Sequence, residues 1–98
     1  MKIKVVYVGP IRTHTRTAEE VLEVAAGTTV SGLLALLCEH HGDGFRDSIF
    51  LDGGHLANFA RVLLDGEDQY EAGGLERNLD GVQEVSILLI PSMAGGRF

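Results

Sequence analysis

The residues of this chain that could do chemistry are few, and the densest group is Cys38, His40 and His41. A thiol and two imidazoles are ligands that zinc prefers, but a structural zinc site needs four ligands, usually with a second pair returning from elsewhere in the chain. On one helix, Cys38 would face the apolar side while the two histidines follow at the helix end, so the three side chains would not converge. We therefore expect a packed core cysteine and no metal site.

The remaining histidines, His14 and His55, stand alone in polar segments, where we expect solvated side chains. We identify no nucleophile with a neighbouring base, and this argues against an enzyme.

Acidic residues are concentrated in segment 65–84, where Arg77 is the single base. We expect a solvated face there. A sharper alternative is that these charges steer the protein toward a basic groove on a partner. The acidic residues are Asp65, Glu67, Asp68, Glu71, Glu76, Asp80 and Glu84.

A tail of small residues, Ala94, Gly95 and Gly96, follows an apolar run and Pro91. Such a tail can thread a narrow cleft, because glycine adopts backbone conformations that are closed to other residues. Pro91 would limit fraying where the preceding strand ends. Taken alone the motif is weak, since the chain has 13 glycines. Its meaning depends on the fold that carries it.

The composition predicts one small folded domain over residues 1–91 and a flexible tail over residues 92–98. Hydrophobic residues make up 45% and charged residues 22% of the 98 residues, which is ordinary globular usage. The net charge of −6 argues against nucleic-acid and membrane-surface partners, which select basic faces. We find no signal peptide, and the single cysteine fits a reducing compartment, so we expect a cytoplasmic protein.

The first half of the chain predicts two strands and a helix. Alternating apolar residues indicate a strand over residues 2–8, followed by a turn over 13–17 and a second strand over 21–24. A helix over residues 30–41 has threonines at its N-cap and Gly42 at its end. Its apolar stripe consists of Val30, Leu33, Leu34, Leu37 and Cys38.

The second half predicts a short helix within residues 43–59 and strands over 61–64 and 85–90, with a minor strand over 69–72. The first and last strands are the most apolar, as expected of central strands. This order predicts an α+β protein with the β-grasp fold, a mixed sheet of four to five strands with one main helix packed on one face. A ferredoxin-like fragment is the alternative, but that fold needs a second helix of similar quality.

The last strand and the tail, VSILLIPSMAGG over residues 85–96, resemble the C-terminal segment of MoaD/ThiS-type sulfur carriers, which are ubiquitin-like β-grasp proteins ending in Gly-Gly. Residues 27–34 (GTTVSGLL) are similar to the start of the family's helix, and residues 57–66 to its third strand and turn. The chain departs from the family where Arg97 follows Gly96.

The resemblance implies that the Gly96 carboxylate is the reactive group. An ATP-dependent, ubiquitin-activating-like enzyme would adenylate it, and sulfur transfer would then give a thiocarboxylate. That group would donate sulfide to an enzyme that makes cysteine, thiamine, molybdopterin, thiolated tRNA or a secondary metabolite. The carrier itself would have no catalytic residue and no bound cofactor.

The peptide bond between Gly96 and Arg97 leaves Gly96 without a free carboxylate. Two further residues also extend an open chain by about 7 Å. The resemblance implies that a JAMM-type zinc metalloprotease removes Arg97 and Phe98.

A second function class stays open, a ubiquitin-like modifier or an interaction module. Gly96 would then be joined to lysines or remain unused. The chemical fate of Gly96 distinguishes the two classes.

The alternation of the strands also predicts an apolar patch on the sheet face away from the helix. Polar residues such as Lys4, Arg61 and Ser86 mark that face. Exposed apolar patches usually bind a partner, and here we expect the adenylating enzyme. The predicted patch consists of Val6, Val8, Leu63, Leu88 and Ile90.

Overall fold

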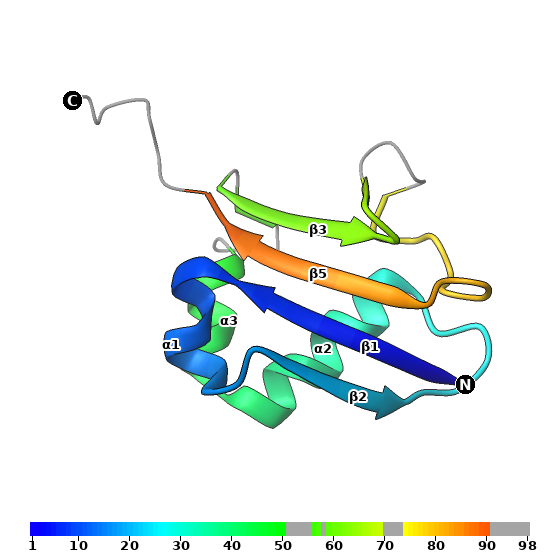
Figure 1. Ribbon diagram of the computed structural model, residues 1–98, viewed down its shortest axis with the longest axis horizontal. Coiled ribbons are helices and arrows are strands. Elements are labelled where there is room, and N and C mark those ends of the chain that lie inside the picture. Colours follow the sequence, from blue (N-terminus) through cyan, green and yellow to red (C-terminus); the bar gives the residue numbers. More distant parts are fainter. Residues whose placement is uncertain (51–55, 58, 70–73, 91–98) are drawn as a thin grey trace.

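The computed structural model describes residues 1–50, 56–57, 59–69 and 74–90 (Figure 1). A five-stranded mixed sheet, in the order β2-β1-β5-β3-β4, lies on one side, and α2 crosses its inner face (Figure 1). The central strands β1 and β5 are parallel, and the other pairs are antiparallel. This arrangement confirms the predicted β-grasp fold. The strands are β1 (Lys2–Val8), β2 (Glu19–Glu23), β3 (Ala60–Leu64), β4 (Glu67–Asp68) and β5 (Glu84–Leu89).

The main helix, α2 (Val30–His41), has the predicted bounds. The Thr29 side-chain oxygen accepts a hydrogen bond from the Gly32 amide at 3.0 Å and so satisfies one of the donors at the helix start. Gly42 ends α2 with a φ of +88°, a conformation that side chains strongly disfavour. The short helix expected after it is α3 (Asp43–Ile49).

The predicted turn over residues 13–17 was wrong. A 3₁₀ turn, η1 (Gly9–Ile11), and a short helix, α1 (Arg12–Thr15), occupy most of this connection. Pro10 suits the first turn of a helix, and Ile11 is fully buried, so the segment is anchored to the core. The Arg12 guanidinium also donates to the Tyr7 carbonyl at 2.9 Å.

Two strand positions also differ from the prediction. The minor strand β4 lies at residues 67–68 instead of 69–72, because Asp65 and Gly66 both have positive φ and form a tight hairpin turn. Leu64 and Glu67 pair directly across that turn. β2 begins at Glu19 and not at Val21, since pairing with β1 continues to Val6.

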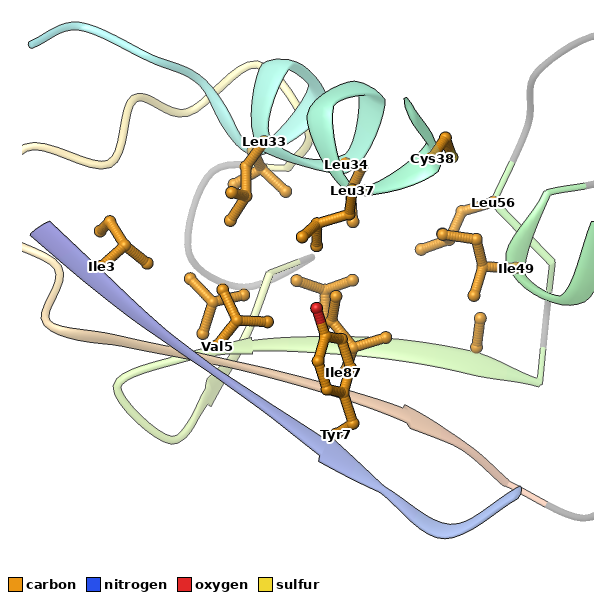
Figure 2. Close-up of a cluster of buried hydrophobic side chains, with 14 of the residues drawn as sticks. Ile3, Val5, Tyr7, Leu33, Leu34, Leu37, Cys38, Ile49, Leu56 and Ile87 are labelled. Atoms are coloured by element: carbon orange, nitrogen blue, oxygen red, sulfur yellow. The ribbon is translucent and has the colours of Figure 1, made fainter. Parts of the chain in front are cut away.

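The core forms where the apolar stripe of α2 meets the inner face of the sheet. All five stripe residues are buried, and Figure 2 shows the side chains of Leu33, Leu34 and Leu37 directed toward the sheet. Ile3, Val5 and Tyr7 point from β1 toward the helix and are fully buried. Within the described residues, no helix is long and apolar enough to span a membrane.

Candidate functional site

The outer face of the sheet carries alternate residues of β1, β3 and β5. Because Val5 and Tyr7 point inward, Val6 and Val8 lie on the opposite face. The strand register places Val8 beside Leu88 and Val6 beside Ser86, while Leu63 pairs with Ser86 from the other side. The structure therefore places these predicted residues on the face away from α2. We call Val6, Val8, Leu63, Leu88 and Ile90 the open-face patch.

The open-face patch is most exposed at the end where β5 finishes. Val8 is 41% and Ile90 40% exposed. Phe59, 41% exposed, joins this end, because the Ile90 amide donates to the Phe59 carbonyl at 2.7 Å. Phe59 was not among the predicted residues, although its position two residues before Arg61 places it on the same face.

Ion pairs border the apolar part of this face. The Lys4 ammonium lies 3.1 Å from the Glu19 carboxylate and 3.9 Å from that of Glu84. The hydrogen bond and the charge of Glu19 raise the pKa of Lys4. Arg61 lies 3.6 Å from the Asp68 carboxylate. An apolar centre with a charged rim is the usual composition of a protein interface.

Gly96 follows Ile90 by six positions, a span of at most about 20 Å in an extended chain. Ala94, Gly95, Gly96 and Arg97 lie outside the described residues. Within the open-face patch, Ile90 is thus the residue nearest to the tail in sequence.

A titratable cluster on the inner side of the sheet was also not predicted. The Tyr7 hydroxyl donates to the Glu20 carboxylate at 2.5 Å, and His41 Nε2 lies 2.8 Å from the same oxygen. Burial and this hydrogen bond raise the pKa of Tyr7. For Glu20, burial acts to raise the pKa, but the hydrogen bonds from Tyr7 and His41 and the histidine charges outweigh it and lower the pKa. The cluster links β1, β2 and the end of α2.

Glu20→Gln tests the contribution of this cluster. A carboxyl with a lowered folded-state pKa stabilises the protein above its ordinary pKa of 4.5, and this contribution is lost as the pH falls through the folded-state value. We expect the substitution to lower the free energy of unfolding by about 1 kcal/mol near neutral pH. The difference from the unmodified protein should shrink as the pH falls below the ordinary carboxyl pKa of 4.5. Urea unfolding at several pH values measures the difference in the free energy of unfolding, and Glu39→Gln on the exposed side of α2 is the control. A difference that stays unchanged at acid pH would contradict a stabilising role of the Glu20 carboxylate.

The single cysteine and the isolated histidines lie at packed positions or outside the described residues. Cys38 is buried in the core, and burial raises the pKa of its thiol. His14 is not a solvated loop residue: it lies in α1, partly buried, and its ring is so close to Gly44 that a Cβ there would approach Nδ1 to 2.9 Å. His55 lies outside the described residues. Among the residues described, no group of three His, Cys, Asp or Glu side chains could hold a metal ion.

Two residues of the acidic segment have specific backbone contacts. Asp65 accepts hydrogen bonds from the Gln83 and Glu84 amides at 3.1 and 2.9 Å, and Asp80 accepts one from Gly27 at 3.0 Å. These carboxylates stabilise loops next to the sheet, beyond the solvation expected of them.

The chain was compared with known protein families, curated proteins and solved structures. No family model and no curated protein matches the sequence. Among solved structures, small archaeal modifier protein 1 from Methanosarcina acetivorans matches with a TM-score of 0.79 and 25% identity, covering 93% of this chain and 94% of that one.

Two further solved structures cover nearly the whole chain. A chain of the BexX/CysO complex from Amycolatopsis orientalis has a TM-score of 0.69 and 26% identity, covering 92% and 97%. A putative molybdopterin converting factor subunit 1 from Pyrococcus furiosus has a TM-score of 0.69 and 18% identity, covering 92% and 98%. By its fold, the chain is similar to these ubiquitin-like β-grasp proteins, among them a small modifier protein and a chain of a BexX/CysO complex.

Proposed function

We propose that this protein carries sulfur on the carboxylate of Gly96. After cleavage of the bond to Arg97, the carboxylate attacks the α-phosphate of ATP on a partner enzyme and releases pyrophosphate. Sulfide then displaces AMP, and the resulting thiocarboxylate donates its sulfur to a biosynthetic enzyme in the cytoplasm. The observation that carries this proposal is a central strand, β5, that contributes to an exposed apolar patch and leads in sequence into Ala94-Gly95-Gly96.

The partner enzyme supplies the catalysis in this proposal, and the carrier supplies the carboxylate and a docking surface. Val8 and Ile90, each about two-fifths exposed, lie at the end of the open-face patch from which the chain continues toward Gly96. An enzyme that covers this end could guide the small residues of the tail into its active site. Removal of water from an apolar patch with a charged rim supports such binding.

A second candidate is a protein modifier, with Gly96 joined to lysine side chains of other proteins. The likeness to small archaeal modifier protein 1 favours it, since the name of that protein describes a modifier. Adenylation of Gly96 is the first step in both cases. The two functions differ in the next nucleophile, which is sulfide in one and a lysine amine in the other.

Val8→Asp tests docking through the open-face patch. We expect a chain ending at Gly96 to gain a thiocarboxylate when incubated with the adenylating enzyme of its own organism, ATP and sulfide. The aspartate should slow this reaction about 10–100-fold, because docking would bury an unpaired charge. Mass spectrometry at timed intervals measures the rate.

Val21→Asp is the matched control. Val21 is 62% exposed on β2, on the same sheet face but outside the open-face patch. This variant places the same aspartate in another strand. Its rate of thiocarboxylate formation should stay within about threefold of the rate of the unsubstituted chain. Equal rates for the two variants would contradict docking through the open-face patch.

A further inference from the structure

The strand β2 forms one edge of the sheet (Figure 1). Val24 and Met1 exchange hydrogen bonds of 2.8 and 2.7 Å, and the Tyr7 amide donates to Ala18 at 2.8 Å. Bonded pairs alternate along an antiparallel ladder, so Glu20, like Val24, directs its backbone groups toward β1. The amides and carbonyls of Val21 and Glu23 therefore point outward. Among the described residues, no strand pairs with this side of β2.

The side chains along this edge divide between two surfaces. Glu19, Val21 and Glu23 lie on the outer face of the sheet, where Val21 is 62% exposed and the side chains of Glu19 and Glu23 are 55% and 66% exposed. Leu22 points to the inner side and packs, partly buried, against the core.

A groove of about 550 Å³ lies between the end of β2 and the exposed side of α2. Gly32, Ala35 and Leu36 of α2 line this groove, and Glu23 and Glu39 contribute carboxylates to its lining. A strand added to β2 would alternate its side chains between this inner side and the outer face. On the inner side, these side chains would contact the small residues Gly32 and Ala35 and the side chain of Leu36.

The charges along β2 disfavour pairing with a second copy of the same strand. Antiparallel pairing of two β2 strands about Val21 would set Glu19 opposite Glu23 at both ends. Lys4 contacts Glu19, and the N-terminal ammonium of Met1 lies 2.7 Å from the Glu23 carboxylate, so each of these charges is offset in part. Glu39 adds a further carboxylate beside the groove, and the chain carries a net charge of −6. The occupant that complements this edge is a segment with basic residues.

We propose that the β2 edge binds an extended peptide segment of a partner protein with the pattern basic–apolar–apolar–apolar–basic. The two basic residues would lie opposite Glu23 and Glu19, and the central apolar residue opposite Val21. The second and fourth residues would point to the inner side, toward the groove. The backbone groups of Val21 and Glu23 provide the hydrogen bonds, as in other cases of strand addition. This surface is separate from the open-face patch, its partner is a protein other than the adenylating enzyme, and the proposal does not depend on sulfur transfer.

A pair of synthetic peptides tests this proposal. One has the core Lys-Val-Val-Val-Lys and the other Glu-Val-Val-Val-Glu, both with Gly-Ser ends and blocked termini. In titrations of the full chain followed by amide NMR, the lysine peptide should shift the Val21 and Glu23 amides. The glutamate peptide should bind about tenfold more weakly, because two attractive cross-strand pairs become repulsive.

Two substitutions locate the site. Val21→Pro removes an outward amide that does not bond to β1, and it should lower the affinity for the lysine peptide about tenfold. Val21→Ala keeps this amide and should change the affinity less than about threefold. Glu23→Lys, at an exposed position, should lower the affinity for the lysine peptide and raise the affinity for the glutamate peptide. Misfolding cannot produce such a reversal.

Three results would overturn the proposal. The first is equal affinity for the two peptides, or no binding of either. The second is a set of amide shifts confined to the open-face patch. The third is dimerisation of the unliganded chain through β2, measured by sedimentation. The last result would assign the edge to a second copy.

Discussion

A chain ending at Gly96 should acquire a thiocarboxylate in the presence of its adenylating enzyme, ATP and sulfide, whereas the chain that continues through Arg97 should acquire none. In the longer chain the carboxyl carbon of Gly96 is held in a peptide bond and cannot attack ATP. Any carboxylate beyond Phe98 lies about 7 Å or more further along an extended chain. Since a misplacement of about 1 Å can cost 100-fold in rate, we expect no detectable product.

Mass spectrometry of the intact protein distinguishes the outcomes, because sulfur replaces one oxygen in the product. A chain ending at Gly95 is the control for shortening as such and should react far more slowly than the chain ending at Gly96. Treatment of the full chain with a JAMM-type zinc metalloprotease from the same organism should release Arg-Phe and restore the reaction, and a zinc chelator should prevent this. Efficient thiocarboxylation of the uncleaved chain would contradict the maturation step.

Leu34→Asp should remove a large part of the stability of the protein. Leu34 is fully buried in the middle of α2, and Figure 2 shows it directed toward the sheet. The substitution removes core packing and places a charge among apolar side chains, at a cost of at least about 4 kcal/mol. A small domain typically has only about 5–15 kcal/mol of stability in total. Chemical denaturation followed by circular dichroism measures the loss.

Ala35→Asp is the matched control for this prediction. Ala35 is the next residue of α2 and is exposed, so the same side chain enters the same helix without entering the core. We expect a loss of no more than about 1 kcal/mol from the lower helix propensity of aspartate. A similar midpoint for the two variants would mean that the wrong face of α2 has been assigned to the core.

The helix and the central strands were predictable because burial imposes a period on the sequence. The spacing of Val30, Leu33, Leu34 and Leu37 fits one face of a helix, and Gly42 ends it where a positive φ is needed. The alternation in β1 also placed Val6 and Val8 opposite the core. These features depend on local sequence, which is the part of the fold that periodicity reports.

The remaining features depend on contacts between distant parts of the chain. Residues 12–15 form a helix because Ile11 anchors the segment in the core, and nothing in the polar run itself signals this burial. The contact of Glu20 with Tyr7 and His41 joins residues up to 34 positions apart. Phe59 contributes to the candidate site through a backbone hydrogen bond with Ile90.

The central claim, that Gly96 carries sulfur, is tested most directly by the C-terminal peptide of this protein isolated from its own cells. After proteolysis under conditions that preserve thioacids, mass spectrometry should find a peptide that ends at Gly96 and contains sulfur in place of one carboxylate oxygen. Its abundance should fall when the adenylating enzyme is deleted. Peptides in which Gly96 is joined only to lysine side chains, or remains joined only to Arg97, would contradict the sulfur-carrier function.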